Sequence, residues 1–193
     1  MGRNYMSILW KNEVIKKLGI KKYDLSNREW ILLLLGVDGK QPIIYEYTFH
    51  VIFFIYSISP FNVKPVLVSV FSDNIHKTLY DLIDEGLVVK KYGFDNYSSK
   101  EIFELTFRGK REVDKILGIV HNRWILIDNI VLKKGSTIID ELTSLKRTYN
   151  DREAKIMLKL LLNHLKSDSS SLLLKFNEDE LKYLRKIIEK ITL

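Results

Sequence analysis

Hydrophobic residues recur at three- and four-residue spacing along most of this chain, which is the repeat of one face of an α-helix. After Ser72 this spacing places Ile75, Leu79 and Leu82 on one face, and a second long stretch of the same kind follows Thr106. The alternation of apolar and polar residues that is typical of a β-strand is confined to short segments. The pattern therefore predicts a mainly α fold with a small β-hairpin.

The hairpin is predicted within the segment from residue 60 to residue 117. An irregular edge strand comes first, and the helix that begins after Ser72 follows it. Residues 87–92 and 102–106 then predict two strands around the polar turn 93–99. Helix, strand, turn, strand and helix in this order are the signature of a winged helix-turn-helix core, in which the hairpin is the wing.

Capping residues mark where the predicted helices begin and end. Ser26 and Glu29 form a capping box, in which each side chain satisfies a backbone N–H at the start of a helix. Ser72 and Thr106 are predicted N-caps, and Gly86 is predicted to end the helix that begins after Ser72. These residues fix the limits of the predicted core helices.

The longest apolar run, residues 43–58, lies between Pro42 and Pro60. It is shorter than the roughly 20 residues that a helix needs to span a bilayer. We interpret it as a buried core helix, with a strand as the alternative because it is rich in β-branched and aromatic residues. No membrane association is predicted.

The chain divides into three predicted regions. Residues 1–25 form an N-terminal helix and a basic connection, whose lysines are either a solvated face or an arm that touches phosphates. Residues 26–125 form the winged-helix domain. Residues 126–193 form a C-terminal helical extension, which either forms a homodimer or braces the domain before it.

Composition and charge narrow the possible functions. The 193 residues include no cysteine, which excludes disulfides and thiolate metal sites and favours a cytoplasmic location. The net charge of +7 favours a polyanionic partner. However, residues 1–30 hold seven Lys and Arg against three Asp and Glu, whereas residues 61–100 hold five against five. The predicted reader domain is therefore close to neutral around its wing.

Several sequence stretches resemble archaeal winged-helix proteins. The stretch from Leu87 to Lys91, followed by FELTFRGK from Phe103 to Lys110, is similar to their wing and the helix after it. With REWILLLL and HVIFFIYS ahead of it, the layout distantly resembles the phage-associated Panacea antitoxin group over residues 26–117. The resemblance implies a winged-helix fold and either transcription regulation or toxin neutralisation through protein contacts. The chain departs from that group where residues 68–71 replace the expected Tyr-Gly-Pro.

Ten residues are predicted to contact nucleic acid. The predicted recognition helix presents outward Asn74, Lys77 and Tyr80. The wing and the helix after it offer a phosphate clamp made of Lys90, Lys91, Tyr92, Lys100, Arg108, Lys110 and Arg111. Three carboxylates on the same helix, Asp73, Asp81 and Asp84, oppose a close approach to phosphates.

Two functions remain after this reading. The first is a DNA-binding transcription regulator that contacts double-stranded DNA. The second is a protein-interaction module, antitoxin-like or an adaptor, for which the acidic outward helix is the supporting feature. No enzyme, cofactor or metal site is predicted, because the four histidines are scattered and the chain has neither a His-Glu-x-x-His motif nor a glycine-rich phosphate loop.

Overall fold

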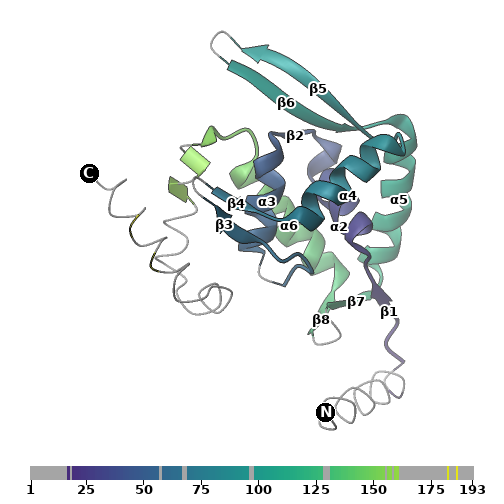
Figure 1. The fold of residues 1–193 in the computed structure, drawn as a ribbon. Helices are drawn as coiled ribbons and strands as arrows, with labels where there is room; N and C mark the ends of the chain where they lie inside the picture. Colours follow the sequence, from purple (N-terminus) through teal and green to yellow (C-terminus); the bar gives the residue numbers. More distant parts are fainter. Residues whose placement is uncertain are drawn as a thin grey trace.

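The computed structural model describes residues 19–160 except 57, 67, 68, 96, 97, 128–130, 155 and 158, and in addition residues 17, 182 and 186. The predicted N-terminal helix and the last part of the predicted C-terminal helical extension lie outside the described residues, apart from these few positions. The described elements, shown in Figure 1, are β1 (Lys22–Asp24), α2 (Asn27–Gly36), η1 (Asp38–Lys40), β2 (Ile43–Ile44), α3 (Glu46–Ile55), β3 (Lys64–Val66), β4 (Ser69–Phe71), α4 (Asp73–Asp84), β5 (Val88–Asp95), β6 (Ser98–Leu105), α5 (Phe107–His121), β7 (Trp124–Ile127), β8 (Val131–Lys134) and α6 (Gly135–Tyr149).

This arrangement corrects the predicted fold class. Besides its helices, the described part of the chain contains two three-stranded sheets, ordered β2-β6-β5 and β1-β7-β8, and the ribbon β3-β4. The fold is therefore mixed α/β, and the prediction of a mainly α protein with one small hairpin is wrong. The second sheet escaped prediction because its strands are three or four residues long and β1 pairs in parallel with β7, about one hundred residues further along.

The predicted hairpin is present and longer than expected. β5 and β6 pair from Val88 opposite Leu105 to Asp95 opposite Ser98, so the strands continue through the segment that was predicted as a turn. The apolar run 43–58 is not one helix, because Ile43 and Ile44 form β2 and pair with β6. Through this pairing the two strands of the hairpin form a three-stranded sheet with β2.

Helices α2 and α3 form the centre of the core. From Trp30 to Leu35 every side chain of α2 is buried, and from Thr48 to Ile55 the same is true of α3. Burial on all sides explains why neither segment has a polar face. Gly36 ends α2 against α5, and a Cβ on it would lie only 2.2 Å from a methyl group of Val113. One hydrophobic cluster includes residues from Leu25 to Met157, so α6 packs on the same core.

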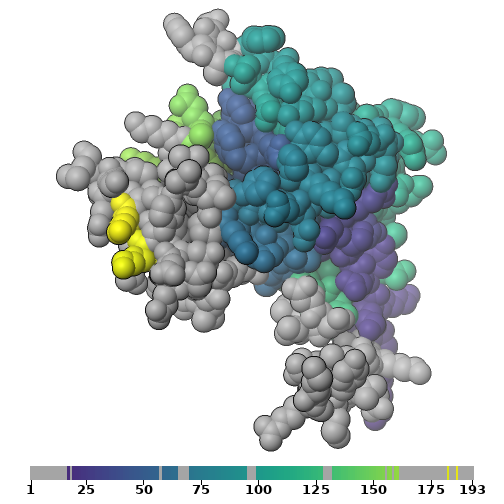
Figure 2. Space-filling view, in the orientation of Figure 1, coloured from purple at the N-terminus to yellow at the C-terminus, as the bar shows by residue number. Residues whose placement is uncertain are grey.

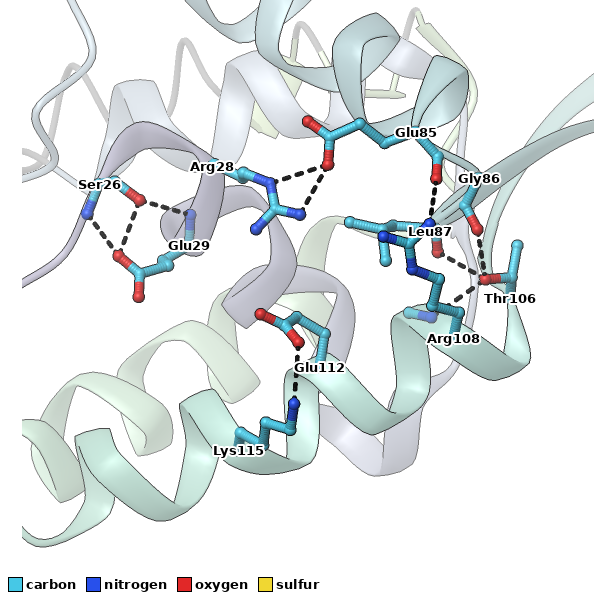
Figure 3. A network of polar contacts seen from close by, with 11 residues as sticks. Ser26, Arg28, Glu29, Glu85, Gly86, Leu87, Thr106, Arg108, Glu112 and Lys115 are labelled. Carbon is cyan, nitrogen blue, oxygen red and sulfur yellow. Dashed lines mark hydrogen bonds and ion pairs between the residues drawn. The ribbon is translucent and has the colours of Figure 1, made fainter.

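The hydrogen bonds at the helix ends agree with most of the predicted caps. Ser26 and Glu29 form the predicted capping box, and Thr106 accepts a hydrogen bond from the backbone N–H of Gly109 at 3.0 Å (Figure 3). Gly86 follows α4 with a positive φ of 69°. Ser72 occupies the N-cap position of α4, but its side chain makes no capping hydrogen bond, which corrects the prediction for that residue.

A buried lysine joins the two halves of the described chain. The Lys146 side chain on α6 has no exposed surface, and its Nζ donates to the backbone oxygens of Leu35 at 2.9 Å, Val37 at 3.0 Å and Gln41 at 2.7 Å. These carbonyls lie at and beyond the end of α2, where a helix leaves its acceptors unpaired. Burial lowers the pKa of Lys146 to about 7, although Asp38 acts to raise it. Lys146 thus completes the C-terminus of α2 from another helix.

Candidate functional site

The hairpin projects beyond the core (Figure 1), and its outer half carries exposed aromatic rings. Every second residue of a strand points to the same side of the sheet, so Val88, Lys90, Tyr92 and Phe94 lie on one face of β5. Val88 is buried at the base of the hairpin, whereas Tyr92 is 61% exposed and Phe94 is 88% exposed. The inner half of the hairpin belongs to the core, and its outer half presents aromatic surface to solvent.

Helix α4 lies beside this face of the hairpin and is strongly two-sided. Its core side consists of the buried Ile75, Leu79 and Leu82, as the sequence predicted. Its exposed residues are Asp73, Asn74, His76, Lys77, Asp81 and Asp84. We call the exposed side of α4 together with the Tyr92 and Phe94 face of the hairpin the hairpin face; Figure 2 shows α4 and the hairpin as part of the blue-to-teal surface over the upper molecule.

A polar network fixes the position of α4 relative to α3 and the hairpin. The Glu46 carboxylate on α3 is 2.5 Å from Nδ1 of His76 and accepts a hydrogen bond from the Tyr80 hydroxyl at 3.3 Å. Tyr80 in turn accepts a hydrogen bond from Lys90 Nζ at 3.0 Å, and the same Nζ pairs with Glu101 at 2.6 Å. The network thus runs from α3 through α4 to both strands of the hairpin.

Two groups in this network have shifted pKa values. Burial alone would raise the pKa of Glu46, but hydrogen bonds from His50 and His76 outweigh it and lower the pKa to about 2. Burial would lower the pKa of Lys90, but its hydrogen bonds to Glu101 and Tyr80 raise it above the ordinary value. Both groups are therefore held in their charged forms at neutral pH.

His50 and Ser72 lie together beneath the network. The backbone N–H of Ser72 donates to Nδ1 of His50 at 3.2 Å, so that nitrogen carries no proton. The Ser72 hydroxyl is buried and has no hydrogen-bond partner among the described residues. Because the backbone N–H and not the hydroxyl contacts the imidazole, this pair is not arranged as a nucleophile with its base.

The three hairpin lysines of the predicted phosphate clamp each bind a carboxylate of the chain itself. Lys90 pairs with Glu101 at 2.6 Å, Lys91 with Glu104 at 2.6 Å and Lys100 with Asp151 at 2.7 Å. The strand register also separates them, because Lys91 and Lys100 lie on the hairpin surface opposite Lys90. The structure brings together Tyr80, Lys90 and Tyr92, with Lys90 Nζ 5.5 Å from each aromatic ring centre.

The remaining predicted residues lie at two other places. Asn74 and Lys77 are exposed on α4, as expected. Arg108, Lys110 and Arg111 are exposed at the start of α5, near the base of the hairpin. Arg108 donates there to the backbone oxygen of Glu85 at 3.2 Å, beside the ion pair of Arg28 with Glu85 at 2.7 Å (Figure 3).

Sequence reasoning missed three residues that define this site. Glu46 looked like a polar interruption of an apolar run, and only the approach of α4 to α3 makes it the centre of a network. Glu101 lies on the same side of β6 as the buried Phe103, directly opposite Tyr92 and next to the partner of Lys90. Phe94 was placed in the predicted turn, and its presence on an extended strand is what orients it with Tyr92.

Comparison with family models, with curated proteins and with solved structures finds no match to this chain. Within the described residues there is no group of three or more His, Asp or Glu side chains that could hold a metal ion. None of the helices in the described part of the chain is both long enough and apolar enough to cross a membrane.

Proposed function

We propose that this protein is a protein-interaction module whose hairpin face binds a positively charged surface of a protein partner. The observation that carries the proposal is the chemistry of that face: α4 exposes carboxylates, and the neighbouring hairpin exposes the rings of Tyr92 and Phe94. Exposed aromatic side chains are the commonest energetic anchors of protein interfaces, and complementary charge steers the partner toward them.

The ion pairs of the hairpin support a protein partner over a phosphate backbone. Binding to phosphates requires lysines and arginines that can replace counterions. The ammonium groups of Lys90, Lys91 and Lys100 already contact carboxylates, and α4 exposes three aspartates against Lys77. Phosphates at this face would have to displace the pair of Lys90 with Glu101 and approach three negative charges, and phosphates on the opposite surface of the hairpin would have to displace the other two pairs.

Cross-linking from the hairpin tip tests this function. A photoreactive amino acid replaces Phe94 in the full chain, or Lys115 on the exposed side of α5 as the matched control. We expect a discrete protein adduct from position 94 only. Reversing the charge of α4 with Asp81→Lys and Asp84→Lys should abolish this adduct. Equal adducts from both positions, or an adduct that nuclease removes, would contradict the proposal.

Double-stranded DNA is the second candidate, favoured by the exposed Asn74 and Lys77 on α4 and by the basic start of α5. The test is binding to duplex DNA at about 50 mM and about 200 mM salt, across which a protein that contacts several phosphates loses affinity steeply. Absence of binding at the lower concentration would eliminate this candidate. Steep salt dependence together with loss of binding in Lys77→Ala would favour it over the protein partner.

A further inference from the structure

Strand β5 forms an open edge of the sheet β2-β6-β5. It is the last strand in that order, so the described strands pair with it on one side only. The other edge of the hairpin is different, because β6 pairs with β2 and its Lys100 binds Asp151 at 2.7 Å. An edge strand presents a row of backbone N–H and C=O groups that can pair with another chain. β5 is therefore the side of the hairpin to which another strand can be added.

The hydrogen-bond register identifies the backbone groups at this edge. The Thr106 backbone N–H donates to the Leu87 oxygen at 3.0 Å, so these two residues begin the ladder as a hydrogen-bonded pair. Hydrogen-bonded and non-hydrogen-bonded pairs alternate along an antiparallel ladder. The odd-numbered residues of β5 therefore bond to β6, whereas Lys90, Tyr92 and Phe94 turn their backbone groups outward. Within the described residues, no backbone hydrogen bond from another element reaches these outward groups.

The outer half of β5 is also open to solvent on both surfaces. Tyr92 and Phe94 are exposed on one surface. Lys91 is exposed on the other, and it binds Glu104 at 2.6 Å, which leaves donors of its ammonium group for a second carboxylate. Gly93 lies between them without a positive φ, so the turn geometry does not require glycine there. A glycine inside a strand is typical of a place where another backbone approaches closely.

The residues at this edge match a second copy of themselves. When two β5 strands run antiparallel with Gly93 opposite Gly93, Tyr92 of each copy lies opposite Phe94 of the other. Both residues have outward backbone groups, so each of these pairs forms two N–H···O bonds. The same register sets Lys91 of each copy opposite Asp95 of the other. The joined strands thus gain two aromatic pairs and two pairs of residues of opposite charge, both of which stabilise a sheet.

The neighbouring registers lack this match. A contact centred on Lys91 would set that lysine opposite itself, and like charges directly opposite each other are destabilising. A contact centred on Tyr92 would set Lys90 opposite Phe94 and Lys91 opposite Gly93, so neither lysine would face a carboxylate. The sequence of β5 therefore favours the register that is centred on Gly93.

We propose that two copies of this chain form a dimer through the outer edges of their β5 strands, with the two-fold axis at Gly93. Such a contact is isologous, because the same strand serves both copies. The hairpin projects beyond the core, so antiparallel strands keep the bulk of the two copies at opposite ends of the contact (Figure 1). The interface is small, and we expect a dissociation constant of about 10 µM. The inference concerns the edge of β5 and does not rest on the proposed protein partner.

Single cysteines test the register directly, because the chain has no cysteine of its own. Gly93→Cys places the two sulfurs at a non-hydrogen-bonded pair, where the Cα atoms are about 4.5 Å apart and a disulfide can form. The nearest atom to a Cβ there is Cδ1 of Ile102 at 3.0 Å, the end of a side chain that can move. The control is Ser99→Cys, which is exposed on β6 opposite Phe94. With oxidised glutathione, we expect covalent dimer to form about tenfold faster from Gly93→Cys.

Sedimentation of the purified full chain measures the dimer without a cross-link. Asp95→Lys sets like charges opposite each other and should weaken dimerisation about tenfold, and adding Lys91→Asp should restore most of it. Asp81→Lys with Asp84→Lys, which should abolish the adduct with the proposed partner, should leave dimerisation within about twofold because α4 is not part of the strand contact. An adduct from position 94 to a second copy should survive the α4 reversal as well. Failure of the dimer and failure of the proposed function are therefore distinguishable.

Three outcomes would overturn the proposal. The first is a chain that stays monomeric up to about 500 µM, far above the expected dissociation constant. The second is equal cross-linking of Gly93→Cys and Ser99→Cys, which would show that any dimer forms elsewhere. The third is a double charge variant that dimerises no better than Asp95→Lys. Unfolding curves identify a charge variant that fails to fold, and in that case the comparison of the two cysteine variants decides.

Discussion

The hairpin face and the sheet β1-β7-β8 lie at opposite ends of α5, and their basic side chains have different neighbours. At the hairpin every lysine contacts a carboxylate, and the neighbouring α4 exposes three aspartates. At the sheet, Lys134 Nζ lies 5.8 Å from the Trp124 ring centre and the Arg123 guanidinium lies 5.9 Å from the Tyr23 ring centre, so these two cations lie over aromatic rings. The comparison shows that net charge does not locate a binding surface; the pairing of each charged group does.

Removing Lys146 should have the largest effect, because it ties α6, which follows β8, to α2 in the core. We expect Lys146→Met to lower the free energy of unfolding by about 4 kcal/mol, since three backbone carbonyls lose their donor. Chemical denaturation measures this loss. A variant as stable as the wild type would show that the three hydrogen bonds contribute nothing beyond packing.

The same residue predicts how stability varies with pH. The folded pKa of Lys146 is about 7, below the ordinary value of about 10.4, so the unfolded chain binds more protons between these limits. The free energy of unfolding should therefore rise with pH from about 7 upward. Measurements between about pH 7 and 9.5, below the ordinary tyrosine range, should show this rise in the wild type and a smaller slope in Lys146→Met.

Two glycines allow each end of α5 to be disturbed by itself. A Cβ on Gly109 would lie 2.0 Å from the backbone oxygen of Leu87 at the base of the hairpin, and one on Gly135 would lie 1.8 Å from that of Val120 beside the sheet β1-β7-β8. We expect Gly109→Ala and Gly135→Ala each to cost about 2–3 kcal/mol of stability, because a backbone atom must move. Gly118→Ala is the control, since nothing lies within 4 Å of its Cβ.

The glycine variants should also differ in their effect on the proposed partner. Gly109→Ala should weaken the cross-link from position 94, and Gly135→Ala, at the other end of α5, should leave it close to the wild type. Both measurements are made under conditions in which each variant remains folded. An equal loss in both variants would show that the cross-link does not depend on the geometry at the base of the hairpin.

Acid should loosen the hairpin face before the sheet β1-β7-β8. The pKa of Glu46 is about 2 in the folded protein, below its ordinary value, so its stabilising contribution is complete above about pH 4.5 and is lost as the pH falls toward 2. We expect Glu46→Gln to be about 2 kcal/mol less stable than the wild type at pH 6, with the difference shrinking toward pH 2. Arg123→Gln should show no such trend, and a constant difference for Glu46→Gln would contradict the prediction.

The smallest expected effect comes from removing two ion pairs of the hairpin. Glu101→Gln together with Glu104→Gln removes the carboxylates that bind Lys90 and Lys91. We expect affinity for duplex DNA at low salt to rise about fivefold, with a steeper salt dependence, because two ammonium groups become available to phosphates. Glu112→Gln with Glu153→Gln removes the same charge elsewhere and should change affinity less. Equal effects would show that pairing at the hairpin does not control its partner.

Much of the local structure could be predicted from the sequence, because its causes are local. The capping box at Ser26, the N-cap at Thr106 and the turn at Gly86 depend on residues a few positions apart, and all three are confirmed. The core side of α4 follows from its helical repeat. The hairpin was predicted for the same reason, since its strands are neighbours along the chain.

What the sequence could not predict depends on contacts between distant residues. The pairing of β1 with β7, the three carbonyls bound by Lys146 and the carboxylate partner of Lys100 all join residues that are remote along the chain. A list of basic residues gives the sign of their charge but not the neighbours that neutralise it. Local patterning thus determined most helix limits and the hairpin, whereas tertiary packing alone decided the mixed α/β fold and which lysines remain able to meet a partner, because an ion pair depends on distance in space.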